Sequence, residues 1–206
     1  RRFGKGRFTI HDSRFTPYQV KTPHPDWIVP DWPAPANVRA FITTRAGGVS
    51  QGPFASFNVG LRSGDDARAV AANRGVLRGM LPHEPKWLRQ VHGNIVVEAD
   101  SLADSQVNAT EADAAVARRP GTVCAVLIAD CVPVLLADRA GTTVAVAHAG
   151  WRGLSSEVVE RTVERMALAP ASLVAYLGPG IGPRACEVGA DVRDAFLARD
   201  PGADAA

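Results

Sequence analysis

Three side chains that can bind a metal ion, or act together in nucleophilic catalysis, lie where predicted strands meet turns. His92 follows a β-rich run over residues 87–91, and His148 follows a second run over residues 142–147; a glycine comes within two residues of each histidine. Cys131 lies between two further apolar runs. Because loops at strand ends gather at the edge of a sheet, we expect these three side chains to converge.

Two imidazoles and one thiolate form a zinc ligand set that leaves the fourth tetrahedral position for water or substrate. The same atoms suit copper, and Cys131 can instead serve as a nucleophile with His92 or His148 as its base. The intervals of 39 and 17 residues match no local metal motif, so a buried thiol with two hydrogen-bonded core imidazoles is an open alternative. We expect Cys124 and Cys186 to be packing residues.

Composition limits the class of protein. The chain has 206 residues, 46% of them hydrophobic and 21% charged, which is typical of one globular domain. Its net charge of +2 originates in residues 1–25, which hold six basic side chains and one acid; the rest has 17 basic and 20 acidic residues, so we expect no nucleic-acid partner. No apolar run reaches about 18 residues, so we expect no membrane partner. Three widely spaced cysteines favour a cytoplasmic location.

Hydrophobic patterning predicts an α/β (α+β) fold: a single domain of mixed β-sheets flanked by helices. We expect residues 1–37 to form a proline-rich N-terminal arm and residues 38–206 to form the domain. The predicted strands cover residues 38–44, 87–91, 95–98, 122–129, 132–138, 142–147 and 173–177, and the predicted helices cover residues 65–81, 155–166 and 189–199. The nearly continuous apolar runs between 122 and 147 favour central strands covered on both faces.

Seven short motifs, in order along the chain, carry a family resemblance. They are Thr43-Thr-Arg-Ala-Gly-Gly-Val-Ser50, Phe57-Asn-Val-Gly60, Gly64-Asp-Asp66 with Asn73-Arg74, Gln90-Val-His-Gly93, Ala129-Asp-Cys-Val-Pro133, Ala147-His-Ala-Gly-Trp-Arg-Gly153 and Leu177-Gly-Pro-Gly-Ile-Gly-Pro183. Over about residues 38–196 the sequence resembles the bacterial laccase-domain family, whose members are also known as multicopper polyphenol oxidases, zinc-dependent purine nucleoside phosphorylases and peptidoglycan editing factors. Members usually continue past the last predicted helix, so we expect the C-terminal part of the family domain to lie outside these residues.

The resemblance implies roles for individual residues. The implied site comprises the metal ligands His92, Cys131 and His148, the catalytic residues Arg45 and Asp130, and the substrate-binding residues Arg45, Asn58 and Arg152. The fork of the Arg45 guanidinium suits a phosphate group. Asp130 can transfer a proton or can orient a ligand from a turn, and Arg152 can contact substrate or form a structural ion pair.

The resemblance implies a zinc-dependent purine nucleoside enzyme that performs phosphorolysis of adenosine and inosine and deamination of adenosine. Its partners would be a small purine nucleoside and phosphate, with Arg45 and the N-terminus of the 155–166 helix as the anion site. Zinc can activate water for attack at C6 of adenine, with loss of ammonia. The His-x-Glu and Pro-Cys-x-x-Cys signature of base deaminases is absent from the sequence.

Three alternatives stand beside this reading. A copper-dependent polyphenol oxidase would use the same ligands, but a multicopper laccase needs paired His-x-His motifs and the sequence has none. A Cys-His hydrolase acting in peptidoglycan editing would use Cys131 as its nucleophile. A binding protein without catalytic activity is the third. The sequence leaves open the preferred nucleoside, the physiological metal and the oligomeric state.

Overall fold

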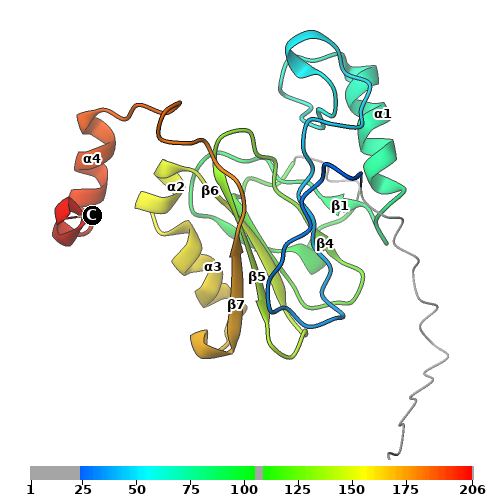
Figure 1. Cartoon of the computed structure of the whole chain (residues 1–206). Helices are drawn as coiled ribbons and strands as arrows, with labels where there is room; N and C mark the ends of the chain where they lie inside the picture. The colour runs from blue at the N-terminus through cyan, green and yellow to red at the C-terminus, as the bar shows by residue number, and fades with distance from the viewer. Residues whose placement is uncertain (1–23, 105–108, 206) are drawn as a thin grey trace, which may run out of the picture.

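A mixed five-stranded sheet forms the centre of the protein, as seen in a computed structural model that describes residues 24–104 and 109–205 (Figure 1). The strands are β1 (Pro85–Lys86), β2 (Val96–Glu98), β3 (Ala114–Ala117), β4 (Val123–Cys124), β5 (Val132–Asp138), β6 (Val144–Ala149) and β7 (Leu173–Leu177), and the helices are α1 (Ala67–Arg78), α2 (Trp151–Ser155), α3 (Val158–Met166) and α4 (Ala190–Leu197). The order in the main sheet is β2-β3-β6-β5-β7, and β1 pairs with β4 in a second sheet. The predicted fold class is therefore confirmed.

Both faces of the main sheet are buried. Alternate residues of β3 point to opposite sides: Ala114 and Val116 belong to the core cluster that contains Val158 and Met166 of α3, whereas Ala115 belongs to a cluster on the other face. Within this sheet β2 runs parallel to β3 and the other pairings are antiparallel, whereas β1 and β4 of the second sheet are parallel. The central strands are thus held firmly on two sides, which suits them to carry a site at their ends.

A third core cluster anchors α1. It consists of Trp27, Phe57, Leu77, Met80 and Trp87. The indole of Trp27 stacks on Phe41 at a ring distance of 5.5 Å, so this residue of the predicted arm packs against the body of the protein. Residues 1–23 of that arm lie outside the described residues, and the division at residue 37 stays a prediction. Among the described helices, none is long and apolar enough to cross a membrane.

Three predicted strands are wrong or shortened. Residues 38–44 contribute only an isolated bridge between Ile42 and Ile28, and residues 87–91 contribute only a bridge at Arg89. Of residues 122–129, only Val123 and Cys124 form a strand. These runs have strand-forming residues but pair with no long neighbouring strand, and a strand needs a partner for its backbone hydrogen bonds. By contrast, β5 and β7 coincide with the predicted runs.

The predicted 155–166 helix is two helices. The helix α2 begins at Trp151, and Ser155 is its last residue. Glu157 then adopts a left-handed conformation with φ of 71°, which breaks the helix before α3 begins at Val158. The carbonyl of Arg152 accepts hydrogen bonds from the hydroxyls of Ser155 and Ser156 at this break. The anion site predicted at a helix N-terminus beginning at Ser155 is therefore wrong.

Candidate metal centre

The structure brings His92, Cys131 and His148 together. One ligating atom from each side chain lies within 4.8 Å of the others, a group able to hold a metal ion. His148 lies within β6 and pairs in register with Pro133 of β5, while Cys131 directly precedes β5. Since β5 and β6 are neighbours in the sheet, their pairing fixes the separation of the two residues. His92 comes from the loop before β2.

The imidazole of His148 is the buried member of the group, with 4% of the residue exposed. Its Nδ1 lies 2.9 Å from Oδ1 of Asp113, which is fully buried. An ionised carboxylate only accepts hydrogen bonds, so Nδ1 carries the proton and Nε2 is left as the ligating atom. The His148 ring meets that of His92 edge-on at a centroid distance of 4.8 Å.

The backbone of His92 adopts a left-handed conformation with φ of 62°, which is uncommon for a residue with a side chain. The carboxylate of Asp113 accepts hydrogen bonds from the backbone amides of His92, at 2.9 Å, Val91, at 3.2 Å, and Gly93, at 2.8 Å. Three successive N–H groups around one anion form a nest that compensates for the strained backbone. The exposed His92 is therefore held from the buried side.

The donor set and its surroundings fit a metal ion. Two imidazole nitrogens and a sulfur are ligands typical of zinc and copper. Gly150 leaves room beside them: a Cβ at that position would lie 2.7 Å from Sγ of Cys131 and 3.3 Å from Cδ2 of His92. A larger residue at 150 would occupy the space of the ligands themselves. The three residues lie in a series from exposed through half-buried to buried, which leaves the group open toward solvent on the His92 side.

The three cysteines differ in environment, and all are free. Burial raises the pKa of the Cys131 thiol, and the neighbouring carboxylates of Asp130 and Asp113 raise it further. A thiol with a raised pKa is a poor nucleophile until a cation stabilises its anion. Cys124, half-buried against a core cluster, has a pKa raised to about 12 by burial, and Cys186 is exposed. Cys124 packs against a core cluster as predicted, whereas the exposure of Cys186 shows that its predicted packing role is wrong.

Arg45 and Asn58 lie in a separate polar cluster. The guanidinium of Arg45 donates to the carbonyls of Ala55, at 2.9 Å, and Pro53, at 2.8 Å, and so fastens the loop that contains them. The side-chain amide of Asn58 donates to the hydroxyl of Ser63 and to Asp65. Both motif residues thus have partners in their own loop, and their predicted roles toward a substrate stay predictions.

The centre of that cluster is the buried amide of Asn73 in α1. Its Nδ2 donates to Oγ of Ser50, at 2.9 Å, and to the carbonyl of Asn58, at 2.8 Å, while its Oδ1 accepts from the amide of Val49. The hydroxyl of Ser50 in turn donates to Asp65, which lowers the pKa of that carboxyl. We call Ser50, Asn58, Asp65 and Asn73 the Asn73 network.

The remaining predicted site residues, Asp130 and Arg152, are exposed and lie close to ligands along the sequence. Asp130 directly precedes Cys131, and its backbone carbonyl accepts a hydrogen bond from Ile181. Arg152 follows His148 by four residues, and its guanidinium lies 4.2 Å from the ring centroid of Trp151. Among the described residues, neither charged group forms an ion pair, so both are available to a ligand.

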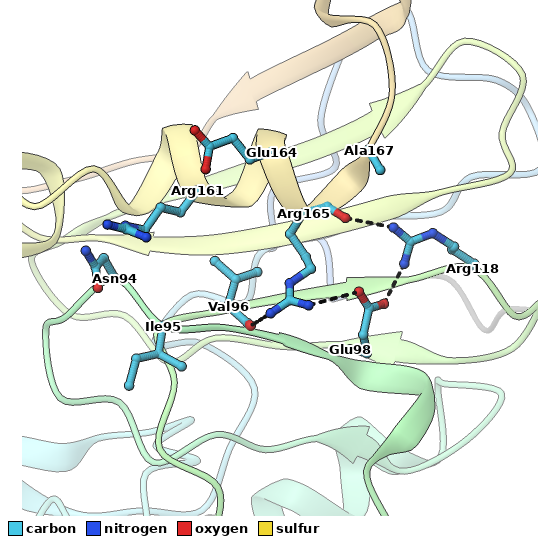
Figure 2. A pocket seen from close by; sticks show the side chains of 9 residues that line it. All are labelled: Asn94, Ile95, Val96, Glu98, Arg118, Arg161, Glu164, Arg165 and Ala167. Carbon is cyan, nitrogen blue, oxygen red and sulfur yellow. Dashed lines mark hydrogen bonds and ion pairs between the residues drawn. The ribbon is translucent and has the colours of Figure 1, made fainter.

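An open cavity of about 650 Å³ lies between α3 and the edge strand β2, and none of the three ligands lines it (Figure 2). The guanidinium of Arg165 donates to the carbonyl of Val96 and faces Glu98, whose other oxygen accepts from Arg118. These ion pairs join α3 to the sheet edge. The charges of this cavity are largely compensated by one another.

Sequence reasoning missed Asp113. Its local signal is a single carboxylate within the otherwise apolar run 112–117. A charge inside such a run is buried only when it is paired or accepts several hydrogen bonds. That rule predicts that Asp113 accepts hydrogen bonds from polar groups near it in the fold, but it does not identify those groups.

Comparison with known proteins places these motifs in a family. A sequence model described as multi-copper polyphenol oxidoreductase laccase matches residues 39–206. The chain is 55% identical over 172 residues to a purine nucleoside phosphorylase of Pseudomonas aeruginosa, a match that covers 84% of this chain and 69% of the relative. It is 51% identical over 181 residues to the purine nucleoside phosphorylase YfiH of Escherichia coli, covering 87% of this chain and 73% of the relative.

Solved structures share the fold. The crystal structure of a Neisseria meningitidis protein superposes with a TM-score of 0.81 at 47% identity, covering 87% of this chain and 73% of the other. The crystal structure of YlmD from Geobacillus stearothermophilus gives a TM-score of 0.70 at 32% identity, covering 78% of this chain and 64% of the other. The segments that carry the three candidate ligands lie within residues 39–206, which the family model matches.

Proposed function

This chain belongs to the multi-copper polyphenol oxidoreductase laccase family, and we propose that it is a zinc-dependent purine nucleoside phosphorylase that also deaminates adenosine. The observation that carries the proposal is the convergence of His92, Cys131 and His148 in a chain 55% identical to a relative named a purine nucleoside phosphorylase. The substrates would be adenosine or inosine together with phosphate. Free cysteines throughout the chain support a cytoplasmic location within the same proposal.

Phosphorolysis transfers the ribosyl group from the purine nitrogen to a phosphate oxygen, and yields the free base and ribose 1-phosphate. The reaction needs a cation to hold the phosphate and a group to manage the proton of the departing base. Arg152 follows His148 by four residues and forms no ion pair with another described residue, and we assign it the phosphate contact. Asp130 is the exposed carboxylate beside Cys131, and we assign it the proton transfer. The catalytic role of Arg45 stays part of the proposal on the strength of its motif alone.

Deamination of adenosine adds water at C6 and releases ammonia, so a proton must move from the water to the leaving nitrogen. When bound by His92, Cys131 and His148, zinc supplies Lewis acidity and makes an attacking water more acidic. Asp113 keeps His148 in one tautomer, and the carboxylate of Asp130 is near enough to the Cys131 thiol to raise its pKa. We therefore assign the Asp130 carboxylate the proton transfer in both reactions.

The other readings have less support. Within residues 24–104 and 109–205 only one group of His, Cys, Asp and Glu can hold a metal ion, whereas multicopper laccase chemistry needs a further copper cluster. The raised pKa of Cys131 disfavours a free thiolate nucleophile of the kind a Cys-His hydrolase uses. Neither the family description nor the relatives' names point to a binding protein.

The test compares metal-free protein with protein reloaded with zinc or copper. We expect zinc to restore phosphate-dependent release of hypoxanthine from inosine, and phosphate-independent release of ammonia from adenosine. Oxygen consumption with a phenol by the copper form, without nucleoside turnover by either form, would overturn the proposal. The variant Cys131→Ser, which lacks the sulfur ligand, should lose both activities. Cys186→Ser is its matched control, because Cys186 is exposed and lies outside the metal-binding group.

A further inference from the structure

We infer that Asp113 is the positioning residue for both imidazole ligands: its one buried carboxylate sets the ligating nitrogen of His148 and the backbone conformation of His92. The inference rests on the proposed metal centre. Asp113 lies immediately before β3 and is 0% exposed. A buried carboxylate needs several hydrogen bonds to be tolerated there, and Asp113 accepts four from groups of the two ligand-bearing segments.

One carboxylate oxygen, Oδ1, contacts both segments, and the other, Oδ2, contacts only the segment of His92. Oδ1 lies 2.9 Å from both Nδ1 of His148 and the amide nitrogen of His92, so a single atom links the two ligands. Oδ2 accepts from Val91 and Gly93, on either side of His92. Any shift of the carboxylate would therefore displace both imidazoles together.

The backbone of Asp113 is itself fixed. Its amide donates to the carbonyl of Ile95 at 3.0 Å, and its carbonyl accepts from the amide of His148 at 2.7 Å. The carboxylate is thus attached to a backbone segment that is hydrogen-bonded to neighbouring segments on both sides. Among the described residues, the amides of Val91, His92 and Gly93 have no hydrogen-bond acceptor other than Asp113. Without it, nothing described would hold His92 in its left-handed conformation.

Asp138 provides a matched control at the opposite end of β5 from Cys131. It is also buried, at 4% exposure, and its carboxylate accepts from the amides of Thr142 and Thr143 and from the hydroxyl of Thr142. Both aspartates support a turn from within the sheet. Only Asp113 contacts metal ligands.

The experiment measures zinc affinity by competition with a chelator, in the wild-type chain, Asp113→Asn and Asp138→Asn. We expect Asp113→Asn to bind zinc about 10- to 100-fold more weakly, because the amide places a donor against groups that are themselves donors. The d–d bands of the cobalt-substituted variant should shift as well. Asp138→Asn should lower the melting temperature comparably and bind zinc within about threefold of wild type. Equal zinc affinities for the two variants would overturn the inference.

A second measurement needs no variant. In ¹⁵N-histidine-labelled wild-type protein, we expect the NMR signals of His148 to show a proton on Nδ1, and zinc to perturb Nε2. Zinc bound at Nδ1, or a metal-free His148 protonated on Nε2 alone, would contradict the inference. No nucleoside enters either measurement, and the metal-free spectrum needs no zinc. A chain that binds zinc as described but turns over no nucleoside would remove the proposed activity and leave the role of Asp113 intact.

Discussion

The metal centre and the Asn73 network are both built from family motifs, yet they use their polar groups in opposite ways. In the Asn73 network the side-chain amide is consumed internally, with hydrogen bonds to Ser50, to Asn58 and from Val49. In the metal centre, the buried carboxylate of Asp113 accepts the hydrogen bond of His148 Nδ1, and ligating atoms from three segments are left close to one another. The number of motif residues in a region therefore does not distinguish a functional site from the structure that supports it. A functional site is recognised by polar atoms that converge and have no hydrogen-bond partner in the protein.

Removal of a ligand should produce the largest effect on the metal centre. For Cys131→Ala we expect loss of the bound metal and a fall in phosphorolysis of at least about 100-fold, since two imidazoles alone hold zinc poorly. Cys186→Ala should retain both. Metal content by elemental analysis and hypoxanthine release are the measurements. Full activity of Cys131→Ala would contradict the comparison, because the two regions would then be equally structural.

Asn73→Ala should damage the scaffold and spare the site. The variant removes the acceptor of the Val49 amide and the donor to the carbonyls of Ser56 and Asn58, so we expect the free energy of unfolding to fall by about 2–3 kcal/mol. Zinc affinity of the folded protein should stay unchanged. Denaturant unfolding and chelator competition measure the two quantities. A selective loss of zinc affinity would instead make the Asn73 network part of the site.

A methyl group at Gly150 tests how tightly the ligands are packed. Because the added Cβ would lie 2.7 Å from Sγ of Cys131, we expect Gly150→Ala to weaken zinc binding about tenfold. Gly75→Ala in α1 is the control: nothing lies within 4 Å of its Cβ, and the substitution should stabilise the helix by up to about 1 kcal/mol. Zinc titration and thermal unfolding distinguish the two. Unchanged zinc affinity in Gly150→Ala would show that the site adapts easily.

The smallest expected effect is a pH dependence at Cys124. Burial raises its pKa from 9.0 to about 12, so the folded state favours the neutral thiol. The stability from this preference is fully present below pH 9, the unfolded value, and is lost as pH rises through the folded value. We expect Cys124→Ala to show a flatter fall in unfolding free energy between pH 9 and about 12 than the wild type. Parallel curves would place the Cys124 thiol in contact with water.

The sequence predicted β5 and β7 correctly but was wrong for most of the equally apolar run 122–129, because pairing with a neighbouring strand decides whether a strand forms. The run 132–138 became β5 because its neighbours β6 and β7 supply a ladder along most of its length. The strand β3 was missed because three of its four residues are alanine, which has weak strand propensity. Its place between β2 and β6 is set by long-range packing, which no local pattern records.

The grouping of the three candidate ligands was predicted on grounds that are only partly right. Cys131 lies directly before β5 and His148 near the end of β6, as the strand-end argument requires, but His92 lies in a loop, since residues 87–91 form only a bridge at Arg89. Asp113 could not be assigned to them, because its partnership depends on the pairing of β3 with β6. Arg45 and Asn58 show the reverse: their motifs are easily read, but only coordinates reveal that their hydrogen bonds are to their own loop.

X-ray absorption at the zinc edge of the purified protein tests the central claim most directly. If His92, Cys131 and His148 hold one zinc ion, the spectrum will show one sulfur at about 2.3 Å and two imidazole nitrogens at about 2.0–2.1 Å, with a light atom in the fourth position. Cys131→Ala should lose the sulfur contribution. A wild-type spectrum without sulfur, or zinc held by four oxygen and nitrogen ligands, would contradict the account.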